Sequence, residues 1–150
     1  MNKYFIYFSL TGNGDYLASL LKEKGYQPIK IETVKPIGKP TFFKIFRYGG
    51  LAMKKAKTPI QQIDIQLKED DEVIIGSPIW NDRLSTPINT VLASLDLNKN
   101  TTRFILYPAG NKTKKSLIQI AKLGYVLPPL MIQYPLKYQE QAVKLLEEWL

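Results

Sequence analysis

The chain has 150 residues, of which 45% are hydrophobic and 23% charged, a composition typical of one soluble domain with a sizeable core. It has no cysteine and no histidine, which excludes disulfides, thiolate metal sites, iron–sulfur clusters, cysteine nucleophiles and histidine-based catalysis. The net charge of +8 is compatible with nucleic acid, an anionic lipid surface or an acidic partner. We see no carboxylate cluster suited to a metal ion. Redox chemistry would therefore require a bound organic cofactor.

The N-terminal apolar run does not have the form of a secretory signal. Residues 4–10 are mostly apolar, but Thr11, Gly12 and Asn13 follow where a small-residue cleavage site is required. No apolar stretch approaches the ~20 residues of a membrane-spanning helix. We therefore expect a cytoplasmic protein without a membrane span.

The first elements are a strand, a helix and a second strand. Residues 4–8 (YFIYF) are apolar and aromatic, which predicts a buried strand. Residues 15–24 have apolar side chains at helical spacing, and Gly25 stands where a helix stop is expected. Residues 28–33 alternate apolar and polar side chains, which predicts a half-exposed or edge strand.

Residues 35–63 have the weakest pattern and the highest positive charge. Seven basic residues lie between Lys35 and Lys57 with no acid among them. Apolar residues on either side of Gly49 and Gly50 indicate one or two short helices. We expect this segment either to attract an anionic ligand or partner, or to be a solvated face with a buried apolar side.

A third strand and a well-marked helix start follow. Residues 72–76 (EVIIG) predict a buried strand. Ser85, Thr86 and Pro87 predict a helix start, with a hydroxyl cap and proline at the first helical position. That helix is expected to run to about Leu95.

The last third of the chain continues the alternation of strands and helices. Residues 103–107 (RFILY) predict a buried strand, and residues 114–123 a helix that ends at Gly124. Residues 130–134 (LMIQY) predict a last strand, and residues 139–150 an amphipathic helix.

Five strands alternating with helices predict one α/β domain over residues 1–150, with a parallel sheet covered by helices on both faces. Ligands of such sheets bind at the carboxyl ends of the strands. Three loops therefore form the candidate site. The first loop is residues 9–14, the second loop is residues 76–87, and the third loop is residues 107–113.

The first loop has the chemistry of a phosphate site. Gly12 and Gly14 allow close approach of main-chain amides, Ser9 and Thr11 supply hydroxyl donors, and the following helix start adds a partial positive charge. The loop has no lysine or arginine, so a phosphate would be bound by neutral donors. It lacks the third glycine of the dinucleotide motif and the Gly-Lys-Ser/Thr of triphosphatases. The alternative is a helix cap that binds nothing.

The other two loops carry weaker signals. Trp80 follows a buried strand, where it either stacks on a planar ring system or covers the core. The third loop has small residues and Gly110, which suit close approach to a ligand but also an ordinary turn. Tyr107 and Tyr134 are expected to be packing residues.

Together, the loops resemble those of the flavodoxin-like family. Ser9, Thr11, Gly12 and Asn13 are similar to its Ser/Thr-x-Thr-Gly-x-Thr phosphate loop. The run Gly76-Ser77-Pro78-Ile79-Trp80, with Thr86 and Pro87, resembles its second loop, and residues 107–111 lie where its third loop lies. The resemblance spans essentially the whole chain. It implies a three-layer sandwich with a five-stranded parallel sheet of order 2-1-3-4-5.

The resemblance also implies FMN as the cofactor. Its phosphate would be held by Ser9, Thr11, Gly12, Asn13 and Gly14. Trp80 would stack on the isoalloxazine ring. The rest of the predicted ring site comes from the second and third loops: Ser77, Pro78, Ile79, Asn81, Ala109, Gly110 and Asn111.

The chain departs from the family in two places. The family's last loop threonine is Gly14 here, which removes one hydroxyl donor, and Asp15 must turn away if a phosphate is bound. The acidic surface of carrier flavodoxins is replaced by a basic chain, which argues against docking on positively charged partners.

The resemblance implies an FMN-binding electron-transfer protein. Its partner would be a redox protein or a nicotinamide cofactor. An acidic partner would dock near Lys35–Lys57. The alternative is an FMN-dependent NAD(P)H:quinone-type oxidoreductase. A basic nucleic-acid-binding module is a third hypothesis, but no nucleic-acid motif supports it.

Overall fold

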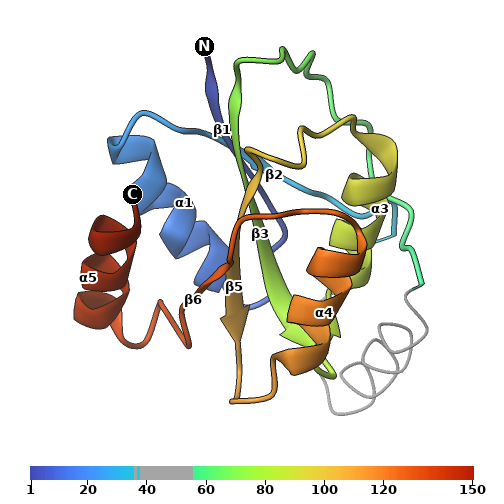
Figure 1. Ribbon diagram of the computed structural model, residues 1–150. Coiled ribbons are helices and arrows are strands. Elements are labelled where there is room, and N and C mark those ends of the chain that lie inside the picture. The colour runs from blue at the N-terminus through green and yellow to red at the C-terminus, as the bar shows by residue number, and fades with distance from the viewer. Residues whose placement is uncertain (36, 38–55) are drawn as a thin grey trace.

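The computed structural model describes residues 1–35, 37 and 56–150 (Figure 1). Most of the basic segment Lys35–Lys57, with the short helices expected around Gly49 and Gly50, lies outside the described residues. No helix among the described residues is long and apolar enough to cross a membrane.

Five parallel strands form the body of the sheet, in the order β2-β1-β3-β5-β6. They are β1 (Lys3–Tyr7), β2 (Gln27–Lys30), β3 (Glu72–Trp80), β5 (Arg103–Pro108) and β6 (Leu130–Met131). Numbered among themselves, they have the predicted order 2-1-3-4-5. A short strand that the sequence did not indicate, β4 (Arg83–Leu84), pairs antiparallel with the end of β3.

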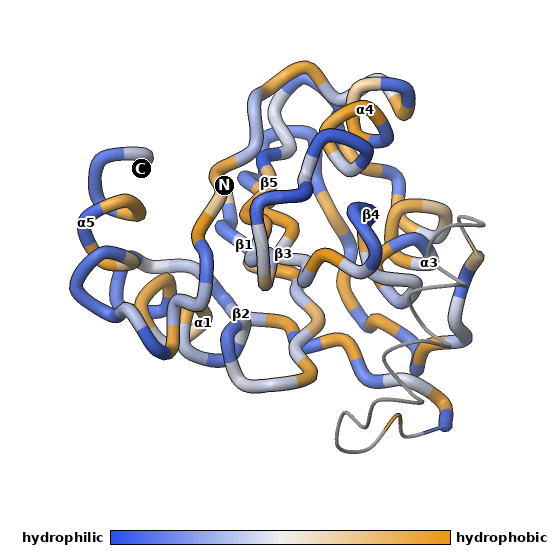
Figure 2. Tube along the Cα trace, turned by 90° about the horizontal axis from the view of Figure 1, so that it is seen from below, coloured by the Kyte–Doolittle hydropathy of each residue, from blue (hydrophilic) through white to orange (hydrophobic). Residues whose placement is uncertain are grey.

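Helices cover both faces of this sheet, as predicted. They are α1 (Asn13–Glu23), α3 (Thr86–Ser94), α4 (Lys114–Lys122) and α5 (Gln139–Trp149). Helices α1 and α5 lie on one face, and α3 and α4 on the other (Figure 1). Hydrophobic and hydrophilic positions alternate along the turns of α4 and α5, as expected for helices with one face on a sheet (Figure 2).

The core consists of two clusters, one on each face of the sheet. Alternate residues of β1 point to opposite faces, so Ile6 belongs to the cluster under α3 and α4 and Phe5 to the cluster under α1 and α5. Fully buried helix residues complete the two clusters, among them Ile88 of α3 in the first and Leu17 of α1 in the second. The three-layer sandwich therefore follows from the period-two pattern of the strands and the helical spacing between them.

Strand β3 continues past its predicted end at Gly76. Its pairing with β5 extends to Ile79, which lies opposite Pro108. A Cβ at Gly76 would lie 2.6 Å from Phe5 Cζ, so this glycine is required by packing inside the sheet and does not end the strand. The predicted second loop is therefore strand up to Trp80, followed by a tight turn.

Two other expectations are corrected. The last strand is Leu130–Met131 and does not reach residue 134: the Ile132 N–H still donates to the Leu106 carbonyl at 2.9 Å, but Tyr134 adopts a left-handed backbone with φ of 44°. Ser85 is the N-cap residue of α3, but its hydroxyl does not cap the helix. Ser85 Oγ instead lies 3.0 Å from Ser77 Oγ in the interior.

Asp71 joins the turn before β3 to the start of the chain. Its Oδ2 accepts the Lys68 N–H and its Oδ1 accepts the Asn2 N–H, both at 2.8 Å. These two hydrogen bonds, the one from Lys68 first, hold the pKa of Asp71 below its ordinary value of 3.8. The negative charge of Asp71 therefore stabilises the pairing of β1 and β3 at their amino ends.

Asp71→Asn should lower the free energy of unfolding at neutral pH, because the amide cannot accept both N–H groups. A lowered folded-state pKa contributes stability above the unfolded value of 3.8, and this is lost as the pH falls through the folded value. The difference in free energy of unfolding between wild type and variant should therefore decrease below about pH 4. Urea unfolding at pH 7, 5 and 3 measures it. Asp70→Asn, which affects only the exposed ion pair with the N-terminus, is the control. A gap that does not change with pH would contradict the assignment.

Candidate functional site

The three loops meet at the carboxyl edge of the sheet, at its lower end in Figure 1. Strands β1, β3 and β5 are adjacent and parallel, so the segments that follow them are neighbours in space. In open α/β sheets, this edge is where ligands bind.

The first loop is closed by an internal hydrogen bond. Ser9 Oγ accepts the Gly14 N–H at 3.1 Å in the protein interior, and Gly12 is the N-cap of α1 with φ of 91°. Asn13 Nδ2 donates to Thr11 Oγ1 at 3.3 Å. The predicted residues are thus brought together in one turn at the start of the helix.

Main-chain N–H groups of this loop remain available. Within the described part of the chain, the N–H groups of residues 10–13 donate to no protein acceptor. They belong to the turn that starts α1, where the helix dipole adds a partial positive charge. The loop can therefore receive an anion by main-chain donors alone.

Gly14 is required by packing. A Cβ there would lie 2.7 Å from the hydroxyl oxygen of Tyr107 and 2.9 Å from both Ser9 Cβ and Tyr7 Cδ2. The Tyr107 hydroxyl donates to the carbonyl of Phe8, and burial raises the pKa of Tyr107 well above its ordinary value, so it stays protonated. The threonine of the family pattern has no room here. Tyr107 is a packing residue, as expected.

Asp15 is turned away from the first loop. Its Oδ1 accepts the Tyr7 hydroxyl at 3.0 Å and lies 2.9 Å from Lys30 Nζ of β2. Burial, followed by the hydrogen bond with Asp15, raises the pKa of Tyr7 above its ordinary value, which keeps the phenol a donor. The carboxylate is therefore offset by a lysine and does not oppose an anion in the loop.

The second loop forms a β-hairpin. Asn81 and Asp82 have φ of 50° and 64°, as both central residues of a type I′ turn require, and Trp80 lies opposite Arg83. Trp80 meets the ring of Phe8 edge to face, with centroids 5.7 Å apart. Trp80 is half-buried, which leaves part of it exposed at this edge. Pro78 and Ile79 are also half-buried, and Asn81 is exposed.

Ser77 does not reach the surface of this loop. It is fully buried, its hydroxyl donates to the Pro78 carbonyl at 2.7 Å, and its Oγ accepts the Ser85 N–H at 3.1 Å. The resemblance to the flavodoxin-like family placed Ser77 among the ring-site residues. The structure gives it the role of joining β3 to the start of α3.

The third loop is held by residues that the sequence did not assign to the site. Gln133 Nε2 donates to the carbonyl of Gly110 at 2.8 Å and to Asn111 Oδ1 at 2.9 Å. The Tyr134 hydroxyl donates to the carbonyl of Ala109 at 2.6 Å. Tyr134 is 40% exposed, so its prediction as a packing residue is wrong. No local pattern indicates these contacts, because they join residues 22 to 25 positions apart.

Arg83 contributes a buried donor beside Trp80. Its Nη1 is the one buried side-chain nitrogen or oxygen of the described residues without a hydrogen-bond partner. A buried donor left unpaired costs about 1–3 kcal/mol, so a partner from a ligand or solvent is expected there.

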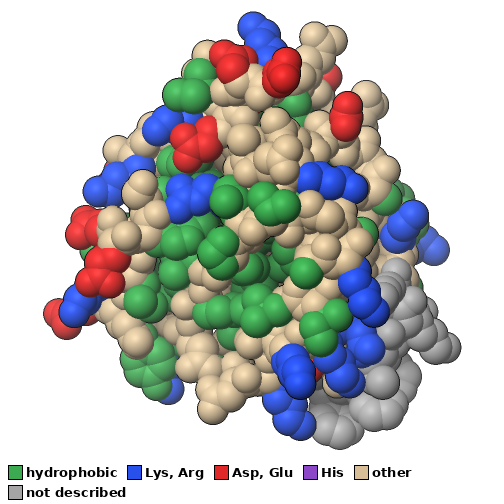
Figure 3. Space-filling view, viewed as in Figure 1, with side chains coloured by type: hydrophobic (Ala, Val, Ile, Leu, Met, Phe, Trp, Pro, Cys, Tyr) green, Lys and Arg blue, Asp and Glu red, His purple; other side chains and the backbone are tan. Residues whose placement is uncertain are grey.

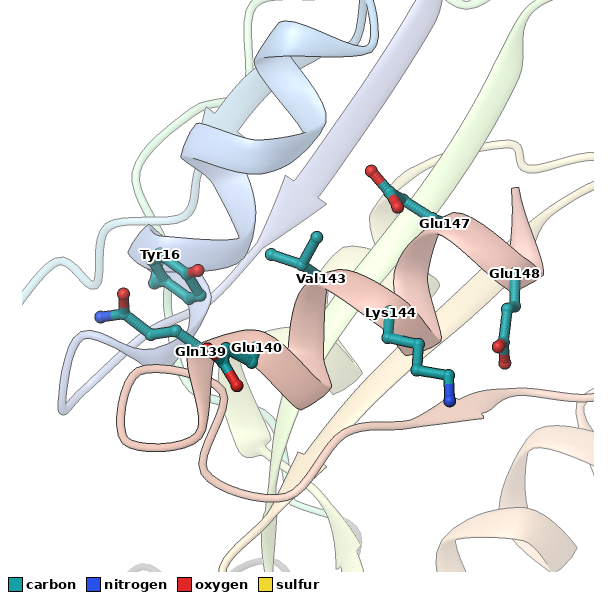
Figure 4. Close-up of a pocket in the computed structure, with 7 residues that line it drawn as sticks. All are labelled: Tyr16, Gln139, Glu140, Val143, Lys144, Glu147 and Glu148. Atoms are coloured by element: carbon teal, nitrogen blue, oxygen red, sulfur yellow. The ribbon is translucent and has the colours of Figure 1, made fainter.

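A shallow groove of about 660 Å³ lies away from these loops, between α1 and α5 (Figure 4). It is lined by Tyr16, Gln139, Glu140, Val143, Lys144, Glu147 and Glu148. None of the predicted site residues lines it. Over residues 1–35, 37 and 56–150, no group of three acidic side chains is arranged to hold a metal ion, and the chain has no histidine or cysteine.

The chain matches no protein-family model and no curated protein sequence. Solved structures resemble it closely in shape. A flavoprotein in complex with FMN from Lactobacillus acidophilus NCFM has a TM-score of 0.67 at 18% identity, over 94% of this chain and 98% of that one. The chain has a flavodoxin-like fold.

Two further structures share this flavodoxin-like fold. The apo form of the flavoprotein from Lactobacillus acidophilus NCFM has a TM-score of 0.63 at 16% identity, over 91% of this chain and 95% of that one. A Bacteroides uniformis ATCC 8492 protein, described provisionally as a flavoprotein, has a TM-score of 0.67 at 17% identity, over 89% of this chain and 90% of that one.

Gly14→Ala should lower the free energy of unfolding by about 1–3 kcal/mol, the usual cost of forcing an extra carbon into a packed interior. The alanine itself would favour the helix, so the loss measures packing. Gly110→Ala is the matched control, because a Cβ there meets nothing within 4 Å. Urea unfolding of both variants tests this. Equal stability of Gly14→Ala and wild type would refute it.

Proposed function

We propose that the chain binds FMN at the three loops and serves in electron transfer. The observation that carries this proposal is the set of unpaired main-chain N–H groups of residues 10–13 at the start of α1. A flavoprotein of the same fold has been solved in complex with FMN. In flavodoxin-like sheets, FMN lies at the switch point between the first and third strands, where this loop stands.

The phosphate would be held by neutral donors. The unpaired N–H groups of Thr11, Gly12 and Asn13 would donate to it, with the hydroxyls of Ser9 and Thr11 as additional donors. Asn13 Oδ1 accepts the Leu136 N–H at 3.2 Å, which ties the loop to the segment before α5. Gly14 supports this arrangement by its packing, and contributes no donor, because its N–H is bonded to Ser9.

The ring would lie between the second and third loops. When bound, FMN supplies one- and two-electron redox chemistry. Trp80, with Pro78, Ile79 and Asn81, offers an apolar wall with a polar end. Ala109, Gly110 and Asn111 face the same edge of the sheet and are exposed. Gln133 and Tyr134 bind two carbonyls of this segment and so fix its shape against a planar ligand.

Electron transfer is favoured over quinone reduction because the three loops contain few carboxylates that could donate a proton. Asp82 is the only carboxylate of the three loops, and its Oδ1 accepts the Lys115 N–H at 3.3 Å. Reduction of a quinone by hydride also consumes a proton, and a positioned side-chain acid speeds that proton transfer. We propose an acidic redox protein as partner; the charge of Lys35–Lys57 supports a positively charged docking region.

Added FMN should bind to the purified protein, quench its tryptophan fluorescence and be released on denaturation. Trp80→Ala should weaken FMN binding roughly tenfold, because the ring loses an aromatic wall. Trp149→Ala is the matched control, since Trp149 stacks on Arg103, with the guanidinium 3.5 Å from the ring centroid. A wild-type protein that takes up no FMN would overturn the proposal. Equal losses in the two variants would remove Trp80 from the site.

The FMN-loaded protein should show no steady-state oxidation of NADH or NADPH with a quinone as acceptor. The measurement is the absorbance of the reduced nicotinamide with and without the protein, corrected for free FMN. Sustained turnover would favour the reductase instead.

A further inference from the structure

Positive charge is concentrated in a second part of the sequence besides Lys35–Lys57. Residues 97–139 contain seven basic residues and no acidic one. This segment includes the third loop and α4, all of which the structure describes. The excess of positive charge is therefore also located at the candidate site.

Three lysines of this segment stand beside the third loop. Lys112 is the next-to-last residue of the loop, and Lys114 and Lys115 open α4; all three are exposed. Within the described residues, none of the three lies within 4.0 Å of a carboxylate oxygen. We call Lys112, Lys114 and Lys115 the basic rim. Lys and Arg side chains gather at the lower end of α4 in Figure 3, whereas Asp and Glu lie mainly at the top and left.

The stability of α4 does not explain the basic rim. Helix N-termini carry a partial positive charge, and a lysine there is unfavourable. The first turn of α4 contains no acid to offset it, and the N-cap Thr113 makes no side-chain cap hydrogen bond. Two lysines at this position add to the local positive potential instead of reducing it.

The basic rim is attached to the predicted ring site. Asp82 of the hairpin accepts the Lys115 N–H, so the turn after Trp80 and the first turn of α4 are in contact. The same hydrogen bond engages the only nearby loop carboxylate. A partner that binds the rim would therefore lie next to the edge where Trp80 and the third loop would expose a ring.

We propose that the basic rim is the docking surface for an acidic electron-transfer protein. The proposal rests on the FMN function proposed above and names its partner surface. Each exposed lysine is a flexible point charge on a long side chain, and the three together match a spread of carboxylates on a protein surface. Such charge complementarity raises association rates by 10- to 1,000-fold at low salt.

The test uses the triple variant Lys112→Gln/Lys114→Gln/Lys115→Gln. Its matched control, Lys22→Gln/Lys99→Gln/Lys122→Gln, removes the same charge from exposed lysines at the opposite end of the sheet. Stopped-flow measurement follows electron transfer between each FMN-loaded protein and an acidic [2Fe–2S] ferredoxin. At low salt, the rim variant should react about tenfold more slowly than wild type, and the control within about twofold. High salt should remove the difference.

Separate readouts distinguish this proposal from the FMN function. FMN uptake is titrated for each protein, and a failure of uptake in wild type would refute the FMN function alone. Carbodiimide cross-linking to ferredoxin needs no FMN, and cross-links should fall on the basic rim and not on Lys22, Lys99 or Lys122. Equal rates in the two triple variants, or cross-links on the control lysines, would overturn the docking surface. Binding of single-stranded DNA is measured as well. If only the rim variant loses DNA binding, and its rate of electron transfer with ferredoxin is unchanged, the rim would be assigned to nucleic acid instead.

Discussion

The contact of Gly14 with Tyr7, Ser9 and Tyr107 is the constraint on which the site depends. Strand β1, helix α1 and strand β5 approach so closely there that no side-chain carbon fits. This approach places Ser9 Oγ in range of the Gly14 N–H and closes the first loop on itself. The remaining amides of the turn are left without internal partners. One close packing contact thus determines which polar groups are satisfied and which remain for a ligand.

Polar groups around that contact are paired in a way that preserves the loop. Tyr107 donates to the Phe8 carbonyl, Tyr7 donates to Asp15, and Asp15 is paired with Lys30. Buried polar groups are costly unless they are hydrogen-bonded, so the hydrogen bonds of the Tyr107 and Tyr7 hydroxyls offset a desolvation cost. They also turn the carboxylate of Asp15 away from the loop. The loop remains neutral in its donors and free of an opposing charge.

In the proposed function, holding the cofactor and attracting the partner are divided between two kinds of group. Main-chain amides do not titrate, and in a closed turn they bind an anion over short distances. The exposed lysines of the basic rim act over a Debye length of about 8 Å at physiological salt. The contact between Asp82 and the first turn of α4 brings the two together at one edge of the sheet.

The sequence by itself determined the layers, the parallel strand order and the position of the three loops, because strand and helix periodicities are local properties of the chain. It also placed Gly12 in the turn before α1, although the helix begins at Asn13, two residues before the predicted start. Only the tertiary structure decided that Ser77 is buried, that β3 extends to Trp80, and that Tyr134 serves the third loop. These features depend on contacts between residues far apart in the chain, such as Gly76 with Phe5 and Tyr134 with Ala109. The space and hydrogen-bond partners available to a side chain are set by elements that local patterns cannot place.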